Sequence, residues 1–168
     1  AVSGIDESSS RGKRISARRG EIFTGKYLPT IRPLPGAREL VATVKARGPT
    51  AVAASSAKKD ELKALLDIAG ARSLMDAATS SDDAEESKPD PDIVHAALKQ
   101  AKAAAADAVM IGDTPYDIEA AGRAGVAAIA FRSRGWGDDD LRGAVAIYDG
   151  PADLLWRLDM SPLARAKL

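Results

Sequence analysis

Short apolar runs alternate with amphipathic segments along most of this chain. The apolar runs contain β-branched residues, as buried strands do, and the amphipathic segments repeat their Leu, Val, Ile and Ala residues at helical spacing. We expect strands at 50–54, 74–78, 108–111, 126–131 and 144–148, and helices at 13–28, 36–47, 59–69, 91–101, 115–125 and 151–158. This alternation predicts an α/β fold, a doubly wound parallel sheet covered by helices on both faces.

The sequence before the first predicted strand divides into two parts. Residues 1 to about 12 are polar and serine-rich, show no periodicity and are expected to form a loop. Pro29, Pro33, Pro35 and Gly36 then interrupt the chain after its first helix. We therefore expect a domain boundary in this segment, with 1–32 and 33–168 as the two parts.

Composition excludes several classes of function. Lys plus Arg and Asp plus Glu each number 24, so the formal net charge is zero, and aromatic residues are few. These values argue against a nucleic-acid partner. The absence of cysteine excludes disulfides and thiol catalysis, and His95 alone makes a histidine-rich zinc site improbable. Without a long apolar run or a signal-peptide pattern, the expected protein is soluble and cytoplasmic, with no membrane partner.

One stretch combines a strand, a tight turn and a helix. Apolar residues 109–111 precede Gly112, which permits a sharp turn, and Pro115 suits the first position of a helix. Asp113 and Asp117 would then face the same pocket. Two carboxylates so close together repel each other, and a bound Mg²⁺ ion would neutralise them. The alternative is a capping box, in which Thr114 and Asp117 only stabilise the start of the helix.

Polar residues follow other predicted strands as well. Ser55 and Ser56 end the strand at 50–54, where hydroxyl and amide groups can bind a phosphate oxygen, although either serine could simply cap the next helix. Lys88 lies in a proline-rich loop that would present it rigidly to a phosphate and an aspartate. A solvated lysine is the alternative there. Because ligands bind beyond the carboxyl ends of parallel strands, these residues are the candidates for chemistry.

Taken together, three segments resemble the motifs of the haloacid dehalogenase superfamily. They are Val52-Ala53-Ala54-Ser55-Ser56, Ser87-Lys88-Pro89-Asp90-Pro91 and Gly112-Asp113-Thr114-Pro115-Tyr116-Asp117. The resemblance covers roughly residues 15 to 158, and the branch of phosphoglycolate phosphatase and β-phosphoglucomutase is the most similar. The segment from Tyr27 to Gly36, with its Leu-Pro and Pro-Leu-Pro-Gly sequences, is also similar to that branch.

The resemblance implies a Mg²⁺-dependent phosphatase that acts on a small phosphorylated metabolite through an aspartyl-phosphate. Ser55 and Ser56 would bind the phosphoryl group, and Lys88 would pair with its oxygens and with the nucleophile. Asp113 would hold Mg²⁺ directly, with Asp117 as a second ligand or as support through water. In the first helix, Arg14, Arg18 and Arg19 could reach an anionic substrate or form a solvated helix face. After the strand at 126–131, Arg132, Arg134 and Trp136 could line the mouth of the site or lie in a surface loop.

The family's first motif, Asp-x-Asp-Gly-Thr-Leu at the end of a strand, is absent from these 168 residues. Asp6 follows no apolar strand, and Asp138, Asp139 and Asp140 lie late in the chain, where we expect a polar helix start. By the resemblance, residues 1–32 are the tail of a helical cap, and 33–168 a core without its first strand and nucleophile. We expect a C-terminal portion of such an enzyme that is inactive alone. The alternatives are a pseudoenzyme that binds phosphate and a phosphomutase.

Overall fold

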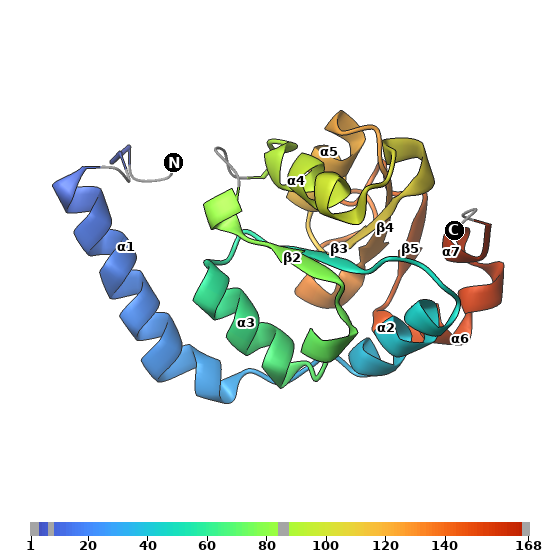
Figure 1. Cartoon of the computed structure of the whole chain (residues 1–168), viewed down its shortest axis with the longest axis horizontal. Coiled ribbons are helices and arrows are strands. Elements are labelled where there is room, and N and C mark those ends of the chain that lie inside the picture. The colour runs from blue at the N-terminus through green and yellow to red at the C-terminus, as the bar shows by residue number, and fades with distance from the viewer. Residues whose placement is uncertain (1–3, 7–8, 84–87, 166–168) are drawn as a thin grey trace. The chain divides into compact units, whose positions relative to one another are not determined.

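The computed structural model describes residues 4–6, 9–83 and 88–165. The predicted fold class is confirmed, because helices alternate with short strands and every strand pair is parallel (Figure 1). The strands are β1 (Val52–Ala54), β2 (Ala77–Thr79), β3 (Val109–Gly112), β4 (Ala127–Phe131) and β5 (Ala146–Tyr148). The α-helices are α1 (Ser10–Ile22), α2 (Ala37–Ala46), α3 (Lys59–Ile68), α4 (Asp92–Ala101), α5 (Pro115–Arg123), α6 (Pro151–Trp156) and α7 (Pro162–Arg165).

The chain divides into two compact units, Ala1–Arg32 and Pro33–Leu168. In the first unit, α1 continues into a π-helical turn at Phe23–Tyr27 and a 3₁₀ turn at Leu28–Thr30. The second unit contains all the strands and the other α-helices. That the first unit is the tail of a cap domain stays a prediction.

The strands form two sheets within the second unit. β1 pairs with β2, while β3, β4 and β5 pair in that order, with β4 in the middle. In the larger sheet, Ile111 of β3 lies opposite Ile129 of β4, and Ile129 lies opposite Ala146 of β5. No ladder of hydrogen bonds joins β1 to β3 in the described part of the chain.

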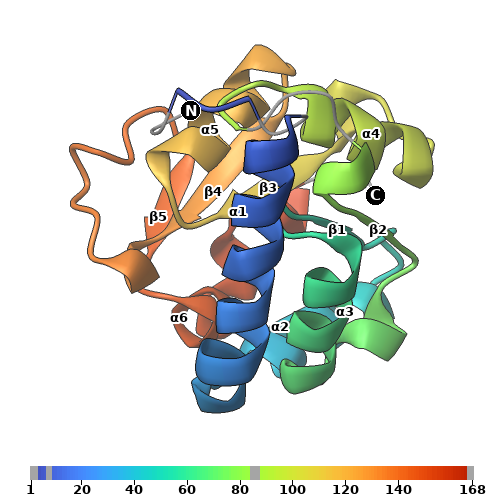
Figure 2. The same cartoon turned by 90° about the vertical axis from the view of Figure 1, so that its left-hand side faces the viewer.

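The residues of β4 alternate between two apolar clusters, one on each face of its sheet. Ala128 and Ala130 pack with residues of α4 and α5, whereas Ile129 and Phe131 pack with residues of α2 and α6. Figures 1 and 2 show α4 and α5 on one side of the strands and α2, α3 and α6 on the other. Helices therefore cover both faces of the larger sheet, as a doubly wound parallel sheet requires.

Several boundaries differ from those predicted by the sequence pattern. The first helix begins at Ser10, inside the predicted loop, because Ser9 caps it by accepting a hydrogen bond from the Gly12 amide at 3.0 Å. The strand expected at 74–78 is β2 at 77–79, because residues 72–74 form a 3₁₀ turn instead. The segment containing Asp138, Asp139 and Asp140 forms turns and no helix. A short apolar run therefore predicts that a strand is present more reliably than it predicts where the strand begins and ends.

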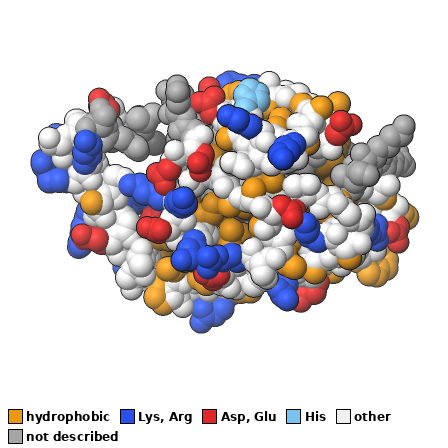
Figure 3. All heavy atoms as spheres, in the orientation of Figure 1, with side chains coloured by type: hydrophobic (Ala, Val, Ile, Leu, Met, Phe, Trp, Pro, Cys, Tyr) orange, Lys and Arg blue, Asp and Glu red, His pale blue; other side chains and the backbone are white. Residues whose placement is uncertain are grey.

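The surface carries both signs of charge. Figure 3 shows basic and acidic side chains interspersed over the visible face, in line with a formal net charge of zero. None of the described helices combines the length and apolar character that crossing a membrane would require.

Helix α6 has one fully buried and one exposed large side chain, and replacing each tests how the core is packed. Leu154 is fully buried among Leu40, Phe131 and Tyr148, whereas Trp156 on the same helix is 84% exposed. We expect Leu154→Ala to lower the free energy of unfolding by about 2–5 kcal/mol, because it leaves a cavity. The control Trp156→Ala should change it by no more than about 0.5 kcal/mol. Urea denaturation followed by circular dichroism measures both, and equal effects would contradict this packing.

Candidate functional site

A lysine and an aspartate from distant parts of the sequence form an ion pair inside the second unit. The Nζ atom of Lys88 lies 2.6 Å from Oδ1 of Asp117, and the two side chains are only 12% and 11% exposed. The same Nζ donates to the backbone oxygen of Ala54, at the end of β1, at 3.3 Å. Lys88 is therefore not a solvated surface lysine, and its ammonium group joins the ends of two separate elements.

The carboxylate of Asp117 also organises the turn between β3 and α5. Its Oδ2 accepts hydrogen bonds from the Asp113 amide at 3.2 Å, the Thr114 amide at 3.1 Å and the Thr114 hydroxyl at 2.7 Å. The Asp117 amide donates to the Thr114 hydroxyl oxygen in return, which completes a capping box. The capping alternative is thus present, and the same carboxylate holds Lys88 as well.

Gly112 leaves room for this arrangement at the end of β3. A Cβ atom at this position would lie 2.4 Å from Cβ of Asp117 and 2.9 Å from its Cγ. Atoms of two side chains cannot approach so closely. The glycine is needed here because the aspartate packs against the backbone, and only a residue without a side chain permits that contact.

The surroundings of Asp117 stabilise its ionised form. Burial alone would raise the pKa of this carboxyl group. The nearby Lys88 ammonium, with hydrogen bonds from Lys88, Thr114 and the Asp113 amide, outweighs burial and holds the pKa below its ordinary value. Asp117 is therefore an anion at neutral pH, paired with a cation.

The serines that follow β1 lie close to the same point. Ser55 comes directly after Ala54, whose oxygen binds Lys88, and its Oγ accepts from the Ala57 amide at 3.1 Å. Neither serine caps α3, since Lys58 occupies the cap position without a side-chain hydrogen bond. Asp82 instead accepts from the Lys59 amide at 3.1 Å. Ser56 is exposed.

The donor set suits a hard divalent cation only in part. Oδ2 of Asp117 already accepts three hydrogen bonds, and its Oδ1 accepts one from Lys88, which leaves this carboxylate little capacity for a metal. Asp113 precedes the helix and is partly buried, so its carboxylate is the better candidate ligand. Among the described residues there is no cluster of three or more potential ligands from His, Cys, Asp and Glu. Mg²⁺ commonly uses one or two carboxylates with water and substrate phosphate, so Asp113 could serve as its single direct carboxylate ligand.

Other residues considered from the sequence make contacts of their own. Arg132, after β4, binds Asp138 and Asp149 through contacts of 2.6 and 2.7 Å, and both acids raise its pKa. Trp136 is 36% exposed, and the side chain of Arg134 lies outside the described part of the chain. These positions fit the surface-loop alternative.

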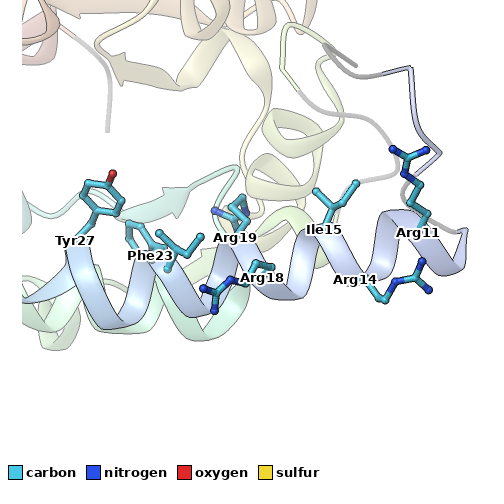
Figure 4. Close-up of a pocket in the computed structure, with 8 residues that line it drawn as sticks. Arg11, Arg14, Ile15, Arg18, Arg19, Phe23 and Tyr27 are labelled. Carbon is cyan, nitrogen blue, oxygen red and sulfur yellow. The ribbon is translucent and has the colours of Figure 1, made fainter.

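The arginines of the first unit line a groove of their own. Arg14, Arg18 and Arg19 border about 730 Å³ along one face of α1 and the turn after it (Figure 4). Arg18 pairs with Glu21 at 2.8 Å. Ile15 and Ile22 contribute apolar surface to the same groove.

The structure thus brings together one part of each of the three segments selected from the sequence. The end of β1 with Ser55, the loop residue Lys88, and the turn from Asp113 to Asp117 are linked through Lys88 and the Asp117 carboxylate. Ser87 lies outside the described residues. Sequence reasoning missed the role of the Ala54 carbonyl, because a backbone acceptor leaves no signal in the sequence. The Thr-x-x-Asp spacing did signal the contact between Thr114 and Asp117.

Comparison with known proteins identifies the family. The sequence model of the haloacid dehalogenase-like hydrolase family matches residues 11–131, which is most of the chain. The chain therefore belongs to this family. Its similarity to proteins named phosphoglycolate phosphatase, and its fold, shared with structures named β-phosphoglucomutase, place it in the branch that the sequence motifs predicted.

Individual relatives give the extent of the similarity. The chain is 34% identical over 156 residues to a probable phosphatase, IndB, of Dickeya dadantii, and 32% identical over 123 residues to a phosphoglycolate phosphatase of Rhodospirillum rubrum. These alignments cover 85% and 71% of this chain, but only 66% and 50% of the relatives. A hydrolase from Pseudomonas syringae has the same fold, with a TM-score of 0.84, 28% identity and coverage of 94% of this chain and 74% of that one.

Two glycines close in sequence test the packing at the turn. Gly112→Ala should displace Asp117 and lower the free energy of unfolding by about 1–3 kcal/mol, because the new Cβ overlaps its side chain. Gly122→Ala is the control, since that exposed glycine lies in α5 with nothing within 4 Å of a new Cβ. We expect it to be neutral or to stabilise the protein by up to about 1 kcal/mol. Urea denaturation gives both values, and a neutral Gly112→Ala would contradict the turn geometry.

The ion pair should appear in the pH dependence of stability. Since the folded-state pKa of Asp117 is lowered, its contribution is present above the ordinary carboxyl pKa and is lost as pH falls through that value toward the folded one. Asp117→Asn should cost about 3–5 kcal/mol at neutral pH, because Lys88 is left buried without its counter-charge. The difference from the unmodified chain should shrink below about pH 4.

Glu119→Gln provides the matched control for this experiment. Glu119 pairs with Arg123 on the exposed side of α5, so its loss should cost no more than about 0.5 kcal/mol. Urea denaturation at a series of pH values gives the comparison. An Asp117→Asn effect that stays constant down to acid pH would show that the carboxylate charge is not what stabilises the site.

Proposed function

We propose that this chain provides the phosphate- and metal-binding part of a Mg²⁺-dependent phosphatase that acts on a small phosphate monoester. The observation that carries the proposal is the convergence of Lys88, the end of β1 and the Asp113–Asp117 turn. The names of relatives, a probable phosphatase and a phosphoglycolate phosphatase, support the same reaction class. The substrate class follows from the family resemblance and from the anion-binding groups.

Lys88 is the group that would meet the phosphoryl oxygens. It is held by Asp117 and the Ala54 carbonyl, so its ammonium is fixed at the carboxyl end of β1 and needs little reorganisation when an anion binds. Ser55, the next residue after Ala54, would donate its hydroxyl to the same group, and the Ser56 amide would add a second donor. Asp117 acts through Lys88 and is in this proposal a positioning residue.

Asp113 would be the direct carboxylate ligand of Mg²⁺. Asp117 would support the ion through water, because Oδ2 already accepts three hydrogen bonds. When bound, a divalent cation would neutralise charge on the phosphoryl oxygens. Lys88 and Asp117 neutralise each other, so the cation would also balance the additional negative charge of Asp113.

The nucleophile is the part of the reaction that we do not assign to these residues. In-line transfer to an aspartate needs a carboxylate opposite the leaving oxygen, and no Asp-x-Asp-Gly-Thr sequence occurs among the 168 residues. We propose that the chain alone binds Mg²⁺ and phosphate without turnover. A phosphomutase of the same family would use the same binding groups, and detection of phosphate transfer between two sugar positions would distinguish it.

Calorimetric titration with Mg²⁺ tests the metal ligand directly. Asp113→Asn should weaken Mg²⁺ binding at least about tenfold, since it removes the charged ligand, while Asp107→Asn should leave binding unchanged. Asp107 is an exposed residue of a 3₁₀ turn that precedes β3. Equal binding by both variants would contradict the assignment of Asp113.

Phosphate binding and turnover are tested separately. Phosphorus NMR titration with inorganic phosphate should show binding that Lys88→Met abolishes and Lys99→Met, an exposed change on α4, preserves. The unmodified chain should release no phosphate from p-nitrophenyl phosphate above the uncatalysed rate, because a missing nucleophile costs about 10⁴-fold or more. Clear Mg²⁺-dependent release by the pure chain would show that the nucleophile lies among these residues.

A further inference from the structure

The segments that follow β3 and β4 leave the larger sheet at the same edge. Gly112, the last residue of β3, lies opposite Ala130 of β4, and neighbouring strands are about 4.8 Å apart. The turn that begins at Asp113 and the loop that begins at Arg132 therefore start at neighbouring points of this edge. Residues of both segments can border the candidate site.

Tyr116 is the exposed residue of the first turn of α5. It is 53% exposed, whereas the next residue, Asp117, is buried and holds Lys88. Side chains of an α-helix are tilted toward the N-terminus of the helix. Because α5 begins just after Asp113, the ring of Tyr116 leans toward the end of the helix at which the candidate metal ligand lies.

The loop after β4 is closed at its base by one arginine. Nε and Nη2 of Arg132 donate to the two carboxylate oxygens of Asp138, at 2.6 and 3.0 Å. Nη1 donates to Asp149, which follows β5, at 2.7 Å. A bidentate contact restricts a loop even where the pair is partly exposed. Arg132 thus fixes the segment 133–137, which contains Trp136, at the carboxyl ends of β4 and β5.

The same loop then packs against α5. Leu141 is fully buried in the apolar cluster that contains Ile118 of α5. A Cβ atom at Gly143 would lie only 3.3 Å from Cγ2 of Ile118. The loop therefore runs from the end of β4 to the first half of α5, where Tyr116 also lies. Trp136 comes between these two attachment points, so this surface loop borders the edge at which the site opens.

The side chain of Trp136 is largely covered by protein. It is 36% exposed, although the glycines on both sides of it are exposed, and Trp156 on α6 is 84% exposed. The indole is therefore held against the molecule with one part accessible. Such a ring can pack against a second flat ring with little loss of conformational freedom.

We propose that Tyr116 and Trp136 form an aromatic rim beside Asp113 and that this rim binds the leaving group of the phosphate monoester. Lys88 would meet the phosphoryl oxygens, whereas an aromatic ring offers them no charge, so its partner is the uncharged part of the ester. The inference rests on the proposed phosphatase function and names its substrate class, esters in which phosphate is attached to a flat, apolar ring. Arg132 is a positioning residue here, because it holds the loop.

Two phosphate esters of equal charge test the aromatic rim. With the full chain and Mg²⁺, calorimetric titration should show that phenyl phosphate binds at least about tenfold more tightly than ethyl phosphate, because only the phenyl ring can stack. Tyr116→Ala and Trp136→Ala should each lower this ratio at least about threefold. Tyr116→Phe keeps the ring and should preserve the ratio. Trp156→Ala, on α6, is the control and should also preserve it.

Fluorescence tests the contact with the rim left intact. The chain has two tryptophans, so Trp156→Phe leaves Trp136 as the only one. Saturation with phenyl phosphate should shift the emission of Trp136 to shorter wavelength, because a stacked ring excludes water from the indole. Saturation with ethyl phosphate should leave the emission unchanged.

The outcomes separate this inference from the proposed function. Equal affinity for the two esters, with inorganic phosphate still bound, would overturn the aromatic rim and leave the proposed function in place. An unchanged emission of Trp136 at saturation with phenyl phosphate would do the same. If neither ester nor inorganic phosphate binds, both the rim and the proposed function are overturned. A ratio that falls equally in Trp156→Ala would assign the aromatic preference to α6 and overturn the rim.

Discussion

A buried ion pair is the constraint on which the candidate site depends. Lys88 and Asp117 are both nearly enclosed, and a buried charge without its partner would cost several kcal/mol. The pair therefore fixes the loop that carries Lys88 against the first turn of α5. The bond from Lys88 to the Ala54 oxygen extends this constraint to the end of β1. Three segments distant in sequence are held together by one ammonium group.

Because of this ion pair, Asp113 and Asp117 have different roles. Asp117 is occupied by Lys88, Thr114 and the backbone of the turn, and Gly112 makes room for it. Asp113 lies four residues earlier, at the carboxyl end of β3, where a metal and a phosphate could meet Lys88. A single carboxylate thus acts as helix cap, counter-ion and positioning group. In the phosphatase that we propose, such rigidity would keep the anion-binding groups in place before substrate arrives.

The site also lies where the sheet is interrupted. Lys88 contacts the carbonyl oxygen of Ala54 at the end of β1, and its partner Asp117 packs against Gly112 at the end of β3. These two strands belong to separate sheets. The ion pair therefore connects the carboxyl ends of the two sheets.

The sequence alone determined the alternation of strands and helices, the family, and the residues to inspect, because periodicity and the short motifs around Lys88 and Asp113 are local properties. It also supplied the capping pattern at Thr114. The ends of β2 and α1 needed the structure, since local turns and caps competed with the apolar pattern there. Only the tertiary structure showed that Asp117 holds Lys88, that Ala54 contributes its carbonyl, and that β1 and β3 do not pair. These contacts join residues far apart in the chain, and their geometry depends on how all the elements pack.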